Sequence, residues 1–437
     1  MSGTDFMNHT SVPQRLLFIR LASGITRGNA LAYLVAAFFS VGLLAFLSFI
    51  QPYTLNVILG IPEDQQGRAT LLLGVLNELI TLLLVGPCGA LSDKIGRRPV
   101  YALGFVWIGA GFAVIPLSQT FPQLVLTTMF WAVGASAVGT MLATVLADTP
   151  DEKSRGALVG LTGICQGLGV MLSVFLLSKL PQLYELRGLE SVAAGRLTYW
   201  TATTLCLLTA LVCFFGLRRE PQSAAARHQS LRQLLREGGA AAANRRILLG
   251  YLVNFIARAD IVVIGTYFSL HITQAALERG FSGADATAQA GIVAGVTQLA
   301  ALLWAFVFLG FADRINRISV VIAAMALAFI GYTWVGLTPD PLAPVIYAAA
   351  IMMGVGEMSA ILSGQLLLGH EAPFAIRGSV FGLAGIFGSI GILFANLFGG
   401  WLYDVWTKSA PFFVIGACNL LVLGFAVYVK SAEHRAA

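Results

Sequence analysis

Runs of about twenty apolar residues recur along almost the whole chain, and they constrain its fold more than any other feature. Each run is long enough to cross the roughly 30 Å of hydrocarbon in a bilayer. Because lipid offers no hydrogen-bond partners, a spanning segment must be a helix or part of a closed barrel. The runs do not alternate in polarity as barrel strands do, so we expect helices. The composition agrees, since 57% of the residues are hydrophobic and only 11% are charged.

The run lengths predict twelve spans, with ends that carry an error of a few residues. We place them at about 31–59, 69–91, 99–117, 121–147, 156–179, 198–216, 247–275, 288–310, 319–337, 343–369, 378–403 and 410–429. Cytoplasmic loops carry an excess of Lys and Arg, which fixes the orientation. With a cytoplasmic N-terminus, 20 basic residues fall in cytoplasmic loops and six in the opposite loops. We therefore expect both termini in the cytoplasm and a multi-pass protein of the plasma membrane, the inner membrane of a bacterium.

The order of the spans divides the chain into five segments. They are a cytoplasmic N-terminal segment, a first six-helix bundle, a cytoplasmic linker, a second six-helix bundle and a cytoplasmic tail, at 1–30, 31–216, 217–246, 247–429 and 430–437. In the linker, Leu231, Leu234 and Leu235 have helical spacing among arginines. This predicts either an amphipathic helix on the anionic inner leaflet or a solvated linker with incidental helicity. The net charge of +6 follows the loop pattern, so we expect no nucleic-acid partner.

The polar residues predict no catalytic, metal or cofactor site. All five cysteines lie inside apolar runs without metal-ligand spacing, and the five histidines are scattered. The sequence has no nucleophile–base constellation and no nucleotide-binding loop of the G-x-x-x-x-G-K-[ST] type. We therefore expect neither an enzyme nor a pump driven by ATP.

Two sequence motifs repeat at a nearly constant offset. The sequence GALSDKIGRR at 89–98 follows the second span, and DRINR at 313–317 follows the eighth, so that the aspartates are 220 residues apart. RGALVGLTGI at 155–164 opens the fifth span and RGSVFGLAGI at 377–386 opens the eleventh, with six of ten residues identical at an offset of 222. Agreement at both places indicates parallel repeats of six spans each.

The loop pattern G-x-L-x-D-x-x-G-R-R, placed between the second and third spans of such a protein, resembles the signature loop of the major facilitator superfamily. The resemblance covers roughly residues 30–430. It implies two six-helix bundles around a central cavity that opens alternately to each side, with the seventh and tenth spans beside that cavity. The second copy of the loop departs from the pattern at Leu309 and Asn316, where glycines would stand. The fourth- and fifth-span motifs of many drug:proton antiporters are missing as well.

The same resemblance implies an electrostatic latch at the cytoplasmic ends of the spans. Asp93 can accept hydrogen bonds at the positive N-terminal end of the eleventh helix. Arg97 and Arg98 can pair with Asp148 or Asp151, and the second loop would repeat this arrangement against the start of the fifth span. The alternative is that the arginines only obey the orientation rule. The predicted gating residues are Asp93, Arg97, Arg98, Asp148, Arg155, Asp313, Arg317 and Arg377.

Four ionisable residues lie inside spans, near the middle of the membrane: Glu78, Arg258, Asp260 and Glu357. Each costs at least ~2.5 kcal/mol against lipid, so they should face the protein interior or each other. Arg258 and Asp260 are two residues apart and point to opposite sides of their helix. Together the four sum to −2, and a low-dielectric site with that imbalance should take up protons.

We predict that these four residues bind the substrate and protons. Asp260 and Glu357 are the candidates for proton carriage or cation recognition, and Glu78 is a candidate for gating or a substrate contact. The alternative is a static buried ion pair of Arg258 with Glu357 or Glu78.

The leading hypothesis is a proton-coupled secondary transporter that works by alternating access as a monomer. The acidic midplane and the aromatic- and methionine-rich spans favour export of amphiphilic or cationic organic compounds. One alternative is import or uniport of a small organic anion that binds Arg258. An alternative of another class is a lipid-handling or sensor protein with the same fold. The expected partners are a small-molecule substrate, protons and membrane lipids.

Overall fold

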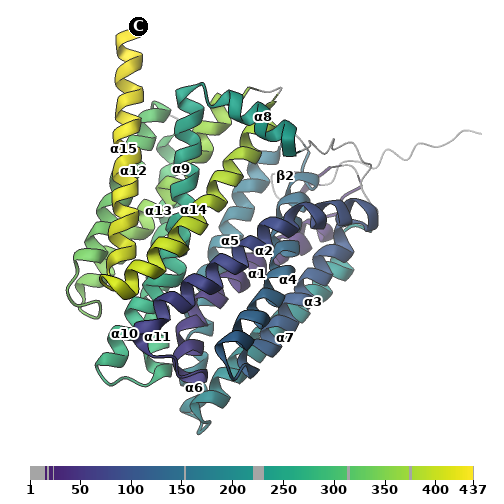
Figure 1. Ribbon diagram of the computed structural model, residues 1–437. Coiled ribbons are helices and arrows are strands. Elements are labelled where there is room, and N and C mark those ends of the chain that lie inside the picture. The colour runs from purple at the N-terminus through teal and green to yellow at the C-terminus, as the bar shows by residue number, and fades with distance from the viewer. Residues whose placement is uncertain are drawn as a thin grey trace, which may run out of the picture.

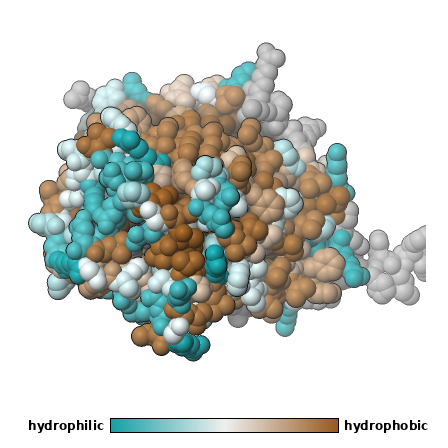
Figure 2. All heavy atoms as spheres, turned by 60° about the horizontal axis from the view of Figure 1, so that its bottom comes forward, coloured by the Kyte–Doolittle hydropathy of each residue, from teal (hydrophilic) through white to brown (hydrophobic). Residues whose placement is uncertain are grey.

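The structure is a computed structural model that describes residues 15–16, 19–22, 24–151, 154–219, 231–312, 315–373 and 376–436. Within these residues, twelve helices are long and apolar enough to cross a membrane, which confirms the predicted number of spans (Figure 1). Figure 2 shows hydrophilic residues gathered over part of one end of the molecule, beside broad hydrophobic flanks.

The N-terminal half contains the first six spans, preceded by a short antiparallel sheet of β1 (Arg15–Leu16) and β2 (Ile19–Arg20). The spans are α1 (Arg27–Tyr53) with the π-helix η1 (Thr54–Ile58), η2 (Glu63–Gln65) with α2 (Gln66–Ile95), α3 (Arg97–Val114) with η3 (Ile115–Leu117), α4 (Phe121–Asp148), α5 (Arg155–Leu177) with the short α6 (Leu180–Glu185), and α7 (Ser191–Gly216).

The C-terminal half repeats this order after a linker helix, α8 (Leu231–Ala241). Its spans are α9 (Arg245–Val262) with the π-helix η5 (Val263–Phe268) and α10 (Ser269–Glu278), then α11 (Gly283–Ala312), α12 (Arg317–Leu337), α13 (Val345–Glu371), α14 (Arg377–Val405) and α15 (Ala410–Ala436). Helix α8 packs on α14. There Ser379 Oγ donates to Glu237 Oε2 at 2.6 Å, and Leu234 lies against Gly382.

The molecule has two ends that differ in the segments they carry. The linker end carries α8, the turn at Gly96 and the start of α12, and it is the end that we predict to be cytoplasmic (Figure 1). The far end carries η2, α6 and the loop between α12 and α13. At the linker end, α2 gives way to α3 at Gly96, whose φ of +97° strains any residue with a side chain. This turn sets Arg97 and Arg98 at the start of α3.

The sequence repeat is also a repeat of packing. A Cβ atom added to Gly169 of α5 would overlap the backbone oxygen of Phe38 in α1. A Cβ atom added to Gly391 of α14, 222 residues later, would overlap the backbone oxygen of Phe255 in α9. In each half, a glycine therefore lets the fifth helix of the bundle touch the backbone of the first.

Candidate transport site

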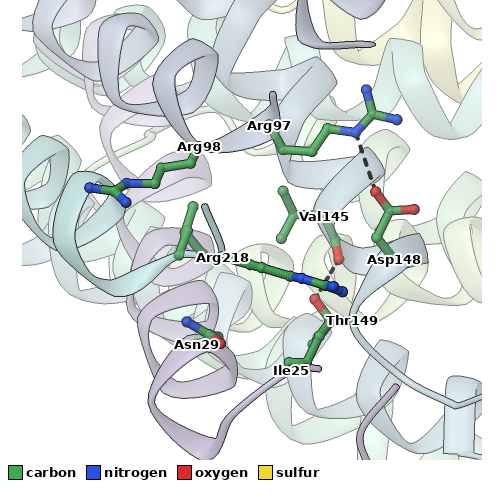
Figure 3. A pocket seen from close by; sticks show the side chains of 9 residues that line it. Ile25, Asn29, Arg97, Arg98, Val145, Asp148, Thr149 and Arg218 are labelled. Carbon is green, nitrogen blue, oxygen red and sulfur yellow. Dashed lines mark hydrogen bonds and ion pairs between the residues drawn. The ribbon is translucent and has the colours of Figure 1, made fainter. Parts of the chain in front are cut away.

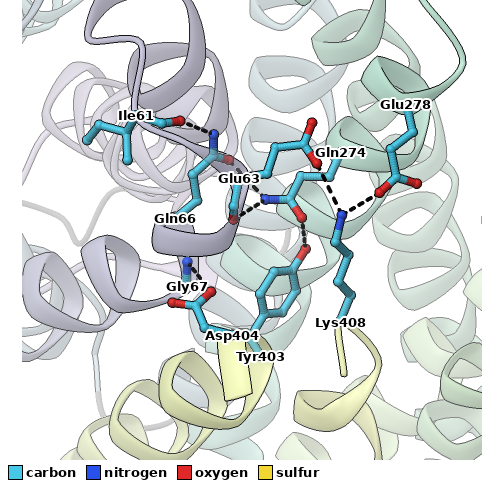
Figure 4. Close-up of polar contacts among 9 residues, drawn as sticks. All are labelled: Ile61, Glu63, Gln66, Gly67, Gln274, Glu278, Tyr403, Asp404 and Lys408. Carbon is cyan, nitrogen blue, oxygen red and sulfur yellow. Dashed lines mark hydrogen bonds and ion pairs between the residues drawn. The ribbon is translucent and has the colours of Figure 1, made fainter. Parts of the chain in front are cut away.

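The two halves touch along two seams, α2 with α14 and α5 with α11. At the far end, a polar cluster ties the halves together (Figure 4). The Gln274 side chain donates to the backbone oxygen of Glu63 at 3.2 Å and to Gln66 Oε1 at 3.1 Å, and it accepts from the Tyr403 hydroxyl at 2.8 Å. Lys408 Nζ lies 3.3 Å from Glu63 Oε2. Gln274 is fully buried, so the far end is closed by a buried polar contact as well as by surface charges.

The second seam is closed at the same end in the corresponding way. Gln182 Nε2 donates to Asp285 Oδ1 at 2.8 Å, which joins α6 to the start of α11. A Cβ atom on Gly291 of α11 would overlap Ser178 at the end of α5. Both seams therefore leave no room at the far end.

Toward the linker end the seams separate. In α5, a Cβ atom at Gly167 would lie 3.0 Å from Leu302 of α11, whereas Gly163 and Gly160 have nothing within 4 Å among the described residues. Gly86 in α2 and Gly385 in α14 have equally open surroundings. Among the described residues, the halves thus touch at the far end and are apart toward the linker end.

Glu78 of α2 and Arg258 of α9 lie near each other beside the α2–α14 seam, near its middle. Glu78 faces Ser389 and the positive charge of Arg258, both from the C-terminal half. The Arg258 stem passes Gly388 of α14, where a Cβ atom would lie 2.7 Å from its Cγ, and the side chain is exposed. Of the two ion-pair partners that the sequence left open for Arg258, the structure brings Glu78 near it.

Asp260 and Glu357 lie together inside the C-terminal bundle. Asp260 is fully buried and Glu357 is 5% exposed. Asn419 Nδ2 donates to Asp260 Oδ1 at 3.3 Å, and Tyr332 and Glu357 are further polar neighbours of Asp260. Asp260 Oδ2 and Glu357 Oε2 have no hydrogen-bond partner among the described residues. The family resemblance places both residues beside the central cavity, but the structure encloses them between C-terminal helices.

The helix geometry explains this division of the four charges. Arg258 and Asp260 point to opposite sides of α9, as their spacing predicts. Arg258 faces the seam with Glu78, and Asp260 faces α12, α13 and α15 with Glu357. The structure therefore holds one pair of opposite charges between the halves and one pair of acids within a half.

At the linker end, Arg97 and Arg98 contact residues of their own half. Arg97 pairs with Asp93, and its Nε lies 3.2 Å from Asp148 Oδ2, so the predicted Arg97–Asp148 pair forms (Figure 3). The Arg98 guanidinium lies 4.5 Å from the ring centroid of Phe214 and points away from this pair. These arginines border a small cavity of about 40 Å³.

The remaining predicted gating residues are placed only in part. Arg377 donates to the backbone oxygen of Gly369 within its own half. Arg317 starts α12, and its Nε is buried without a partner among the described residues. Asp313 lies outside the described residues, and so does the side chain of Arg155. The gating role of this group stays a prediction.

Sequence reasoning missed the far-end cluster. Asp404 and Lys408 look like ordinary loop charges at the ends of spans, and Gln274 like a tolerated polar residue. The sequence held one signal, the repeat offset of 222, which relates Gln182 to Asp404. In the structure, each of these side chains contacts the start of a helix in the other half.

This chain belongs to the Major Facilitator Superfamily, whose family model matches residues 31–395 and 252–437. The chain is 28% identical over 405 residues to the magnetosome protein MamZ of Magnetospirillum gryphiswaldense, an alignment that covers 89% of this chain. It spans only 60% of the length of that relative. It is also 27% identical over 429 residues to the magnetosome protein MamH of Paramagnetospirillum magneticum, with 94% of each chain covered.

Solved structures show the same fold. The nucleoside transporter NupG superposes with a TM-score of 0.69 and 14% sequence identity, covering 93% of this chain and 99% of NupG. The family confirms the resemblance drawn from the loop motif and the prediction that the chain belongs to a family of transporters rather than of enzymes. The fold confirms the architecture of twelve spanning helices.

Proposed function

We propose that this protein is a proton-coupled secondary transporter of a small organic molecule, acting as a monomer. It works by alternating access in a bacterial inner membrane, with the linker end in the cytoplasm. The structure is then the state that is open to the cytoplasm, because the seams are closed at the far end and separate toward the linker end. The basic residues of the linker-end loops support this orientation.

The buried acid pair carries the proposal of proton coupling. Two carboxyl groups that are 0% and 5% exposed, with no cationic side chain among their described polar neighbours, cannot both stay ionised in a low-dielectric bundle. A proton neutralises such a pair most simply. Since Asp260 and Glu357 lie behind the seam, they suit proton carriage better than direct contact with substrate.

Substrate contacts then fall to the residues of the seam. Glu78 suits a cationic group of the substrate and Arg258 an anionic group. The sequence favoured export of cationic compounds because all four midplane charges were taken together. With the acid pair enclosed in one half, the seam holds one charge of each sign, so a substrate that carries both signs fits it better. The direction of transport stays an expectation from the sequence.

The test is transport by the purified protein in liposomes that contain a pH-sensitive dye. A panel of cationic, anionic and zwitterionic compounds is added outside, and internal pH is followed. We expect at least one compound to drive proton movement in liposomes with protein and not in empty liposomes. Uptake of a radiolabelled compound with no proton movement at any imposed pH gradient would contradict proton coupling.

Transport of a small organic anion is the second candidate, and the exposed guanidinium of Arg258 favours it. The two candidates differ in their dependence on Glu78. If the substrate is an anion held by Arg258, Arg258→Lys should weaken its transport and Glu78→Gln should not. If the substrate carries both charges, both variants should weaken transport.

A further inference from the structure

The start of α2 lacks a cap from its own segment. Gln65 stands at the N-cap position and makes no side-chain cap. The N–H of Gln66 donates to the backbone oxygen of Glu63, but the N–H groups of Gly67 and Arg68 need partners from elsewhere. Asp404, at the end of α14 in the other half, supplies them. The N–H of Gly67 donates to Asp404 Oδ1 at 3.0 Å (Figure 4). The N–H of Arg68 donates to Asp404 Oδ2 at 2.7 Å.

This contact is built closely on both sides. The Asp404 side chain is only 2% exposed, so water contributes little to stabilising its charge. The two N–H groups and the positive end of the α2 dipole stabilise the charge instead. A Cβ atom on Gly67 would overlap Asp404 and would lie 2.8 Å from the backbone oxygen of Gly400. Only glycine lets α14 approach the α2 terminus this closely. The contact is a helix cap that forms only when the two halves meet at the far end.

The two helices carry such carboxylates reciprocally. Helices α2 and α14 pass each other in opposite directions across the seam, so the C-terminal end of each lies at the N-terminal end of the other. Asp93 stands two residues before the end of α2, and Asp404 stands one residue before the end of α14. Here Asp404 caps α2, while Asp93 pairs with Arg97 in its own half.

We propose that Asp404 is a positioning residue of the transport cycle, which holds the far end closed by capping α2. Its release accompanies formation of the opposite cap, by Asp93 on the start of α14. This inference rests on the proposed function, transport by alternating access. It assigns a state-dependent role to Asp404, which none of the predicted gating residues covers.

The test measures which end is open, with two reporter cysteines in separate proteins. Ser269→Cys reports the far end, because Ser269 is 1% exposed and its hydroxyl donates to the Phe49 backbone oxygen across the halves at 3.2 Å. Gly163→Cys reports the linker end, where its surroundings are open. Alkylation rates are read for each peptide by mass spectrometry in the purified full chain, without substrate or gradient.

Asp404→Asn keeps one acceptor oxygen but loses the second one and the negative charge at the start of α2, so it should raise labelling at Ser269→Cys about tenfold and lower labelling at Gly163→Cys. Asp93→Asn should lower labelling at Ser269→Cys, because it weakens the state closed at the linker end. Asp340→Asn is the matched control, since this far-end carboxylate pairs with Arg279 inside the C-terminal half and should change neither rate.

Gly67→Ala offers a second route to the same result, because its methyl group displaces Asp404 without removing the carboxylate. It should also raise labelling at Ser269→Cys. The proposal is overturned if Asp404→Asn and Gly67→Ala leave both rates unchanged, or if Asp340→Asn shifts them equally. Because the assay needs neither substrate nor proton gradient, its failure is separate from a failure of proton coupling.

Discussion

The two halves of this protein share their packing but differ in what they bury at corresponding positions. Gly169 contacts Phe38 in the N-terminal half as Gly391 contacts Phe255 in the C-terminal half, so Phe38 and Phe255 occupy corresponding positions. Counted on from these two residues, Leu43 corresponds to Asp260. Gly134 and Gly356 each contact the helix that precedes their own, so they correspond, and the next residues, Ala135 and Glu357, correspond as well. Gly111 and Gly331 each contact the helix that follows their own, so Phe112 corresponds to Tyr332. All three residues of the N-terminal half are apolar, and all six are buried.

This difference shows that the fold itself does not need the acid pair. One bundle closes its core with Leu43, Phe112 and Ala135, and the other sets Asp260, Tyr332 and Glu357 at the same places. Buried acids cost stability unless they are neutralised, and an apolar replacement of similar volume is often neutral or stabilising. A pair that the fold could replace, and that costs stability, is best explained by function.

The largest effect should come from giving the N-terminal half an acid of its own. Ala135→Glu buries a carboxyl group among apolar neighbours, and we expect it to lower the free energy of unfolding by about 3 kcal/mol or more. Thermal unfolding in detergent measures this loss. Leu186→Glu, at an exposed position directly after α6 and outside the spans, is the control and should be tolerated. A variant at position 135 as stable as wild type would mean that this core admits charge as readily as its counterpart.

Glycine substitutions test whether the packing is truly repeated. Gly169→Ala and Gly391→Ala each press a methyl group onto a backbone oxygen, so both should lower the free energy of unfolding by about 1–3 kcal/mol. The controls, Gly163→Ala and Gly385→Ala, lie on the same helices in open space and should be neutral or stabilising by about 0.5–1 kcal/mol. If only one of Gly169→Ala and Gly391→Ala lowered the free energy of unfolding, the packing would not be repeated between the halves.

Replacing the acid pair by its N-terminal counterparts should have a smaller effect on stability. The double variant Asp260→Leu, Glu357→Ala should unfold with a free energy equal to that of wild type or higher by about 1 kcal/mol. Glu371→Ala serves as a control, because it removes an acid that lies 2.8 Å from Arg246 and should cost at most a little stability. A large loss in the double variant would show that the acids support the fold.

The smallest effect concerns pH and the far-end loop. The hydrogen bond from Arg279 lowers the pKa of Asp340. A carboxyl group whose pKa is lowered by folding stabilises the protein at neutral pH and loses that contribution as pH falls through the lowered pKa. Asp340→Asn should therefore be slightly less stable than wild type at neutral pH and equal to it in acid. Melting temperatures across this range measure the difference, and a gap that widens in acid would contradict the sign.

The sequence was sufficient for the spans and for part of the site. Apolar run lengths predicted twelve helices because lipid forces each span to be a helix, and residue spacing alone predicted that Arg258 and Asp260 face opposite ways. It could not predict that Asn419 of the last span meets Asp260, because helix neighbours depend on packing. Nor could it show that Asp404 caps α2, because a cap between halves depends on which end of the molecule is closed.

Proton coupling through the acid pair is tested most directly by proton movement in liposomes for three carboxylate variants, with a compound that wild type exchanges for protons. Asp260→Asn and Glu357→Gln keep the shapes of the side chains but remove the titratable groups. We predict that both abolish substrate-driven proton movement. Glu78→Gln, at the seam, should change substrate affinity and leave the number of protons moved for each substrate as in wild type. Wild-type proton coupling in both Asp260→Asn and Glu357→Gln would contradict the proposed role of the acid pair and place the coupling site elsewhere.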